Sequence, residues 1–225
     1  MSSIMLSHVS YTYRGAQTAA VKGASCTFEP GLLYAVVGPS GSGKSTLLSM
    51  LAGLDLPTEG EVTFDGRNLN DLDLDRYRRE SIAMIFQAFQ LFPLLTVLEN
   101  VCYPMELCGV KPADARERAK ILLERVGITK DKHNRFPSNL SGGEQQRVAI
   151  ARSLSAGAKT LLADEPTGNL DVANTEKIME ILQGLSHNDG CCVIVVTHDQ
   201  EVSGIADVVF TMKDGALMVQ QTDKN

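Results

Sequence analysis

A short glycine-rich segment combines residue types that bind polyphosphates. It comprises Gly38, Pro39, Ser40, Gly41, Ser42, Gly43, Lys44 and Ser45, and Thr46 follows it. Glycines at this spacing let successive backbone N–H groups turn toward one anion. Lys44 can reach the β- and γ-phosphates and assist cleavage of the bond between them. The Ser45 hydroxyl is a hard oxygen ligand that suits Mg²⁺. We therefore expect these residues to bind a nucleoside triphosphate, of a class that the segment alone leaves open.

Two adjacent acids, Asp164 and Glu165, follow the apolar run at 160–163. Adjacent residues of a strand point to opposite sides, so Asp164 can face the Mg²⁺ while Glu165 orients or deprotonates an attacking water. The alternative is that both acids only cap the next helix. Beside the phosphate-binding segment, the pair predicts hydrolysis of the bound nucleotide.

A second set of small residues begins a helical stretch: Ser141, Gly142, Gly143 and Glu144. Unpaired N–H groups at a helix start form a further phosphate-binding end. The string from Leu140 to Arg147, LSGGEQQR, resembles the signature of the ABC ATPases, LSGGQ, with Glu144 where many members have Gln. This string is far more specific than the first segment.

The resemblance extends from Tyr13 to His198 and implies how the two phosphate-binding ends work together. In the family, two chains enclose two ATP molecules, and each site combines the phosphate loop of one chain with the signature of the other. We therefore expect a second copy of the chain as partner. The resemblance also implies that Asp171 contacts the dimer partner, that Gln87 contacts Mg²⁺ and water, and that His198 senses the γ-phosphate.

The adenine ring needs an aromatic surface. Tyr13 aligns with the family residue that stacks on adenine, although Tyr11 would face the same side of a strand. We predict Tyr13.

Short apolar runs without strict alternation predict strands buried on both faces of a parallel sheet, at 32–38, 160–165 and 191–198. Each ends in a polar residue before a helical pattern, and open α/β sheets bind ligands at such carboxyl ends. The runs at 4–13 and 61–66 alternate, which predicts antiparallel strands. From about 97 to 156 the sequence is mostly helical, with one face formed by Ala115, Ala119, Leu122 and Val126.

We therefore predict an α/β fold: a P-loop NTPase body with a mostly parallel sheet, an antiparallel β subdomain and an inserted helical subdomain. The resemblance implies that residues 1–225 form a single ABC ATPase domain. Residues 1–87 and 157–225 form the body, and residues from about 88 to 156 form the helical subdomain.

Composition limits the partners. A net charge of −6 disfavours nucleic acid, because binding the phosphate backbone requires clustered Lys and Arg. No apolar run is long enough to span a bilayer, and the start lacks the features of a signal peptide. We expect a cytoplasmic protein that meets the inner face of the membrane only through a partner.

The stretch from Asp164 to Asp171, DEPTGNLD, resembles the form found in the lipoprotein-releasing, macrolide-exporting, peptide-resistance and cell-division groups of ABC ATPases. This resemblance implies an ATP-hydrolysing subunit that powers a separate integral membrane permease. A cell-division ATPase that regulates an extracytoplasmic enzyme remains an alternative. Soluble ATPases acting on DNA or ribosomes are disfavoured, since the chain lacks their coiled coils or second ATPase half.

The segment Ala88–Thr96 is unusually apolar and directly follows Gln87. Such a segment either packs into the core or meets a partner. Because Gln87 can report the γ-phosphate, we expect the permease to dock at the exposed members of Phe89, Leu91 and Phe92.

Overall fold

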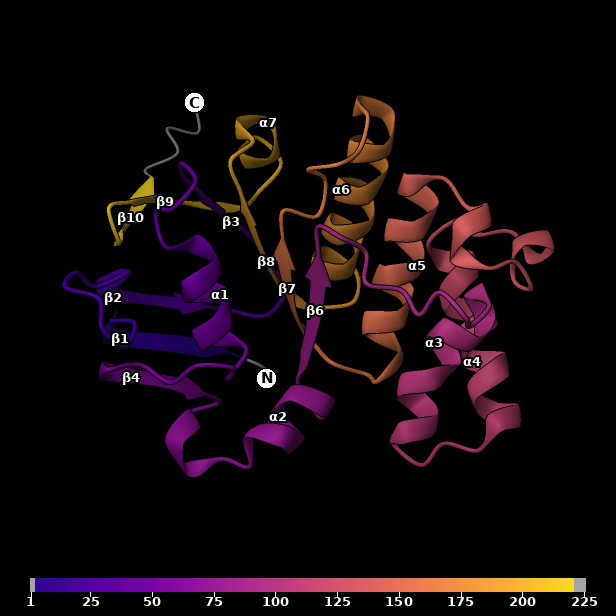
Figure 1. The fold of residues 1–225 in the computed structure, drawn as a ribbon, viewed down its shortest axis with the longest axis horizontal. Coiled ribbons are helices and arrows are strands. Elements are labelled where there is room, and N and C mark those ends of the chain that lie inside the picture. The colour runs from indigo at the N-terminus through magenta and orange to yellow at the C-terminus, as the bar shows by residue number, and fades with distance from the viewer. Residues whose placement is uncertain (1–2, 221–225) are drawn as a thin grey trace.

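The computed structural model describes residues 3–220 and has a central six-stranded sheet (Figure 1). The strand order is β10-β9-β3-β8-β7-β6, parallel except for the β9–β10 pair. The predicted buried runs form its centre, as β3, β8 and β7. The bounds are β3 (Leu33–Val37), β6 (Ile82–Phe86), β7 (Thr160–Asp164), β8 (Cys192–Thr197), β9 (Val208–Lys213) and β10 (Ala216–Gln220).

Both faces of this sheet are covered, which explains why its strands do not alternate with polar residues. Leu161 and Val193 belong to one buried cluster with helix α6 (Val172–His187), whereas Leu162 and Ile194 belong to another with helix α1 (Lys44–Leu51). The polar residues at the strand ends are thus held at one rigid edge.

A second, antiparallel sheet packs against the α1 side and has the order β2-β1-β4-β5. The sequence predicts β1 and β4 but not β2, whose pairing with β1 is irregular and whose pattern of buried residues does not alternate. The bounds are β1 (Ile4–Tyr11), β2 (Val21–Phe28), β4 (Glu59–Phe64) and β5 (Arg67–Asn68).

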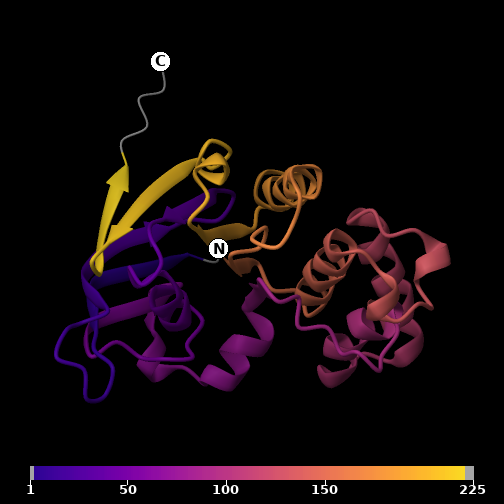
Figure 2. The same ribbon diagram turned by 45° about the horizontal axis from the view of Figure 1, so that its top comes forward.

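The middle of the chain forms a helical group that stands beside the sheets (Figure 2). Its helices are α3 (Val97–Leu107), α4 (Pro112–Arg125) and α5 (Gly142–Ser155), with short 3₁₀ turns at Lys130–Lys132 and Pro137–Asn139. On α4, Leu123 is fully buried and Leu122 only partly, because the buried face follows Ala115 and Ala119 at four-residue steps. The α/β fold class is confirmed, and the subdomain boundaries at 88 and 156 stay predictions.

Other short elements complete the described chain: a 3₁₀ turn at Leu69–Asp71, α2 (Leu74–Glu80) and α7 (Gln200–Ser203). No helix within residues 3–220 has both the length and the apolar character needed to cross a bilayer.

Candidate functional site

The glycine-rich segment forms a tight loop between β3 and α1. A Cβ atom on Gly38 would lie 2.2 Å from the carbonyl oxygen of Met212, and one on Gly43 would lie 2.2 Å from that of Ala20. Gly43 also has φ of 106°, in the left-handed region. Only glycine fits at these positions. Helix α1 starts at Gly43 without a side-chain cap, so its first N–H groups remain available to an anion.

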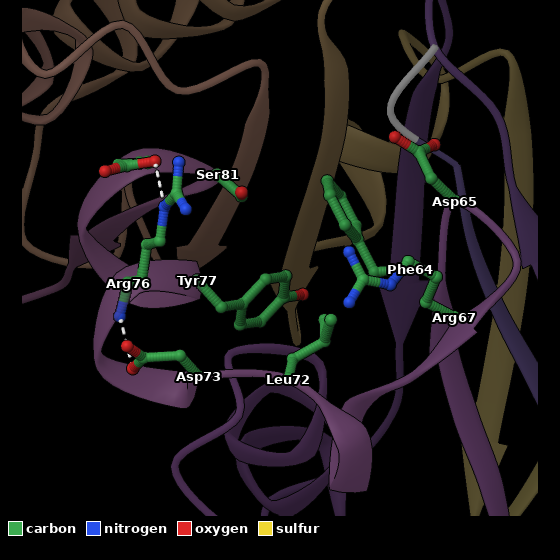
Figure 3. Close-up of a pocket in the computed structure, with 9 residues that line it drawn as sticks. Phe64, Asp65, Arg67, Leu72, Asp73, Arg76, Tyr77 and Ser81 are labelled. Atoms are coloured by element: carbon green, nitrogen blue, oxygen red, sulfur yellow. Dashed lines mark hydrogen bonds and ion pairs between the residues drawn. The ribbon is translucent and has the colours of Figure 1, made fainter.

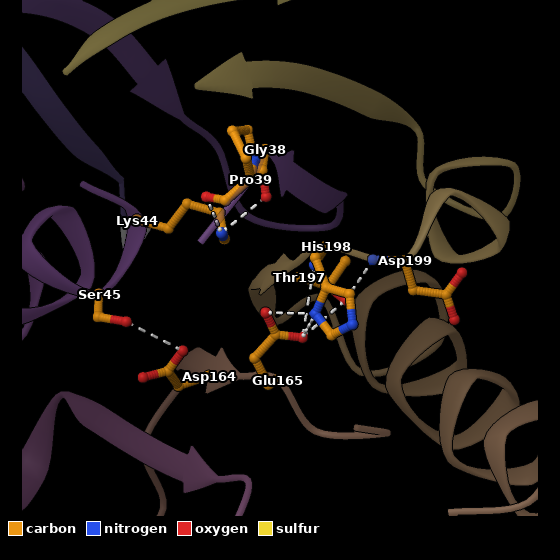
Figure 4. Close-up of polar contacts among 9 residues, drawn as sticks. All are labelled: Gly38, Pro39, Lys44, Ser45, Asp164, Glu165, Thr197, His198 and Asp199. Atoms are coloured by element: carbon orange, nitrogen blue, oxygen red, sulfur yellow. Dashed lines mark hydrogen bonds and ion pairs between the residues drawn. The ribbon is translucent and has the colours of Figure 1, made fainter. Parts of the chain in front are cut away.

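The Lys44 ammonium lies inside this loop. It donates to the carbonyl oxygens of Gly38 at 2.8 Å and Pro39 at 3.0 Å (Figure 4). Lys44 is 7% exposed. The loop thus holds a positive charge beside the free N–H groups of α1.

A cleft of about 860 Å³ opens over the loop and collects predicted residues from distant parts of the chain. Beyond the loop residues and Thr46, its lining residues are Tyr13, Ala20, Gln87, Asp164, Glu165 and His198. Ser141, Gly142, Gly143, Glu144 and Asp171 do not line it.

Asp164 faces the loop from the end of β7. Its Oδ1 atom accepts a hydrogen bond of 3.4 Å from Ser45 Oγ (Figure 4). Burial raises the pKa of Asp164, and the charge of Glu165 adds to the rise, while the Ser45 bond and Lys44 oppose it. The Asp164 carboxylate is hydrogen-bonded to the Ser45 hydroxyl, and Gln87 lines the same cleft. Together the three side chains offer hard oxygen donors, which fits Mg²⁺.

Glu165 turns away from Asp164, for a reason that differs from the predicted one. It lies beyond β7 with φ of 49°, so a left-handed turn and not strand alternation sets its direction. Its carboxylate accepts from Thr197 Oγ1 at 3.0 Å and lies 3.0 Å from His198 Nδ1 (Figure 4). The predicted base is thus held by Thr197 and His198. The sequence did not indicate the role of Thr197 in this contact.

The two candidate tyrosines have different surroundings. The Tyr13 hydroxyl lies 2.8 Å from Thr46 Oγ1 on α1, and its side chain borders the cleft. Tyr11 donates to Asp55 Oδ1 at 3.1 Å and does not line the cleft. The geometry therefore favours Tyr13.

The signature residues start helix α5 outside the cleft. Ser141 is the N-cap, and its Oγ accepts from the Glu144 N–H at 3.3 Å, while Glu144 Oε2 accepts from the Ser141 N–H at 2.9 Å. A Cβ atom on Gly143 would lie 2.1 Å from Asn174 Oδ1, whereas one on Gly142 would make only ordinary contacts of 3.6 Å. Packing within the chain thus explains glycine at position 143 but not at 142.

Glu144 has a partner that the sequence did not indicate. Lys132 donates to Glu144 Oε1. This bond, together with the Ser141 N–H, lowers the pKa of Glu144 to about 2. Glu144 is therefore ionised, and the positive charge of Lys132 compensates its negative charge.

Asp171 caps helix α6. Its Oδ1 atom accepts from the backbone N–H of Asn174 at 2.8 Å and from Asn174 Nδ2 at 2.9 Å. Asn174 in turn accepts from Arg147 Nη1 at 3.4 Å. Asp171 is thus tied to the start of α5 through Asn174, and its predicted contact with a partner chain stays a prediction.

Two further residues of α5 donate to the chain segments that adjoin Glu165 and Gln87. Buried Gln146 donates to the carbonyl oxygens of Pro166 at 2.9 Å and Phe86 at 3.4 Å, next to Glu165 and Gln87 respectively. Arg152 donates to the carbonyl oxygens of Phe89 and Gln90. No local pattern predicts these contacts, which join residues 20 to 63 positions apart.

A separate hollow of about 480 Å³ lies between β4 and α2 (Figure 3). It contains no predicted site residue. The Arg76 Nε atom donates to Glu80 at 2.9 Å, so this cation is already compensated.

Comparison with known proteins decides the family. A family model described as ABC transporter matches residues 21–168. The chain belongs to the ABC transporter family. It is 43% identical over 205 residues to the lipoprotein-releasing system ATP-binding protein LolD of Aquifex aeolicus, covering 90% of this chain and 91% of that protein. It is 41% identical to the macrolide export ATP-binding/permease protein MacB of Syntrophobacter fumaroxidans, covering 96% of this chain and 31% of that protein.

Solved structures agree with this assignment. The dimeric structure of MJ0796, an ABC transporter cassette from Methanocaldococcus jannaschii, matches with a TM-score of 0.86 and 42% identity, over 95% of this chain and 96% of that one. A structure of MJ0796 in a post-hydrolysis state with ADP and Pi matches equally well, at 41% identity. The chain is thus the ATP-binding subunit of an ABC transporter, an ATPase with the P-loop NTPase fold.

Proposed function

We propose that the chain hydrolyses ATP as one of two identical chains that enclose two nucleotides. One observation carries the proposal: the cleft holds the phosphate loop and the catalytic acids, while the free N–H groups of the signature helix start outside it. A signature of a second copy then completes each cleft. The structure of MJ0796 supports this, since that cassette is dimeric.

Within the cleft, Tyr13 stacks on adenine, and the loop from Gly38 to Thr46 binds the phosphates. Ser45, Asp164 and Gln87 hold Mg²⁺, which when bound offsets phosphate charge. The raised pKa of Asp164 supports this assignment, because a cation relieves a desolvated carboxylate.

Glu165 is the general base that takes a proton from the attacking water. Its bonds to Thr197 and His198 fix the carboxylate in one orientation. His198 is an exposed neighbour that contacts the γ-phosphate, and Lys44 stabilises the charge that develops there.

Dimer formation by the Glu165→Gln variant tests the proposal. This change removes the base but keeps the shape, so ATP persists at the interface. Analytical ultracentrifugation should give a monomer without nucleotide and a dimer with Mg-ATP, and adding Ser141→Arg should abolish the dimer. The same mass with and without ATP would refute the paired mechanism.

The chain powers a separate integral membrane permease from the cytoplasmic side, in an export or lipoprotein- or peptide-handling system. The likeness to LolD and MacB, a lipoprotein-releasing ATP-binding protein and a macrolide export protein, supports this assignment. The permease is of the kind found in macrolide exporters and cell-division systems. The chain reaches the membrane only through it and binds no nucleic acid.

Permease docking takes place around the segment after Gln87. A groove of about 210 Å³ is lined by Met84, Pro104 and Leu107, by Arg78 and Arg79, and by Arg152, which donates to the carbonyl oxygens of Phe89 and Gln90. Leu94, in the apolar segment that follows Gln87, is 87% exposed. Phe89 and Leu91 are half-buried, so of the residues expected to dock, Phe92 at 41% exposure is the accessible one.

A pull-down and an ATPase assay with the cognate permease test the docking site. Leu94→Asp and Phe92→Ser should weaken assembly and permease stimulation but leave basal hydrolysis of the isolated chain near normal. Ile121→Asp, at a 60% exposed position of α4, is the matched control. Normal assembly of both docking variants would refute this site.

A further inference from the structure

The signature end of α5 carries a charge that opposes its proposed task. Glu144 lies in the first helical turn, where its carboxylate stabilises the helix but repels an approaching phosphate. The phosphate-binding end of this chain therefore needs a compensating cation.

Lys132 is placed to supply it. The Lys132 ammonium binds Glu144 Oε1, while Glu144 Oε2 accepts the Ser141 N–H, so both carboxylate oxygens are engaged. The side chains of Lys132 and Glu144 are only 27% and 17% exposed, which limits screening by water. Arg147, the other cation near Glu144, directs its guanidinium to Asn174.

We propose that Lys132 is a positioning residue for the signature: it neutralises Glu144, so that the start of α5 attracts the γ-phosphate of ATP bound to a second copy of the chain. The inference rests on the paired mechanism proposed above. The Ser141 hydroxyl and the free N–H groups of the first turn then face the phosphate without a nearby net negative charge.

The test compares variants in the Glu165→Gln background, so that hydrolysis does not consume the dimer. Lys132→Met removes the cation and should raise the Kd of the Mg-ATP-dependent dimer about tenfold. Adding Glu144→Gln to it should restore the parental Kd, because Gln can still accept the Ser141 N–H. Lys132→Arg should retain the parental Kd. Lys120→Met removes the exposed partner of Glu117 and controls for total charge.

Three measurements separate charge from structure: the dimer Kd by ultracentrifugation at low and high salt, the ATP affinity of the monomer, and the melting temperature. We expect the Lys132→Met defect to shrink at high salt, while ATP affinity stays at the parental value and the melting temperature falls no further than in Glu144→Gln, which lacks the same ion pair. An unchanged dimer Kd in Lys132→Met, or a double variant with a Kd as high as that of the single one, would overturn the role of Lys132. The paired mechanism would stand in that case. A parent that fails to dimerise with ATP would overturn the paired mechanism and this inference together.

Discussion

Helices α1 and α5 both begin with small residues, yet their first turns differ in chemistry. Helix α1 starts at Gly43 with no side-chain cap and no acid in its first turn. Helix α5 starts at Ser141 with a reciprocal capping box and the acid Glu144. The first end is open to an anion within its own cleft. At the second end, the capping box uses the N–H groups of Ser141 and Glu144, and the N–H groups of Gly142 and Gly143, which have no partner within the helix, can bind only an anion presented from outside the cleft.

The largest expected effect concerns the cation at the open end. Lys44→Ala should reduce ATP hydrolysis at least about 100-fold, because no other Lys or Arg within residues 3–220 lines the cleft to stabilise the developing charge. A steady-state ATPase assay measures this, with Lys120→Ala as an exposed control. Residual activity within a few-fold of the parent would show that the loop backbone suffices.

Two adjacent glycines test whether the second end responds to an outside ligand. Gly143→Ala should lower the unfolding free energy by about 1 kcal/mol, since its methyl group displaces Asn174. Gly142→Ala meets nothing closer than 3.6 Å and should fold normally, yet weaken the ATP-dependent dimer by placing a methyl group in the phosphate's path. Urea melts and sedimentation separate the two. Normal dimerisation of Gly142→Ala would contradict the phosphate-binding role.

The aromatic residue near the open end should affect affinity alone. Tyr13→Ala should weaken ATP binding about tenfold through lost stacking, with little change in folding. Tyr11→Ala loses the bond to Asp55 and should mainly lower the melting temperature. Titration with a fluorescent nucleotide distinguishes the two. Weaker binding in Tyr11→Ala with unchanged binding in Tyr13→Ala would assign the adenine contact to Tyr11.

Neutralising Asp164, which faces the phosphate loop, and neutralising Glu144, at the start of α5, should change the free energy of unfolding in opposite directions. Burial raises the pKa of Asp164, so its ionised form costs stability at pH 7, and Asp164→Asn should raise the free energy of unfolding while losing hydrolysis. Glu144→Gln should lose stability, because that carboxylate is paired. Chemical denaturation without nucleotide measures both, and a loss in Asp164→Asn would show that Ser45 and Lys44 already compensate the acid.

The smallest expected effect is on the free energy of unfolding at low pH. The folded pKa of Glu144 is about 2 against an ordinary 4.5, so its contribution is present above about pH 4.5 and is lost as pH falls toward 2. Because water screens this partly exposed pair, the contribution is about 0.5 kcal/mol. Glu144→Gln should flatten stability over that window, as followed by melting temperature. Parallel curves for parent and variant would argue against a tight Lys132 pair.

The sequence predicted the chemistry at strand ends more completely than the contacts between helices. The phosphate loop and Asp164 follow buried strands, and local pattern plus parallel topology brings them together. The direction of the Glu165 side chain depends on a left-handed backbone conformation, which glutamate rarely adopts and which the sequence therefore did not indicate. The partners of Glu144 and Gln146 depend on tertiary packing between segments that no local period links.

The loop glycines also constrain when this protein can first bind ATP. Gly38 packs against the backbone of Met212, and β3 lies between β8 and β9, both of which follow it by more than 150 positions. During synthesis, the phosphate loop therefore emerges long before the strands that shape it. Nucleotide binding must await nearly the whole described chain, so a ribosome-bound fragment ending before β9 should not compete for cellular ATP.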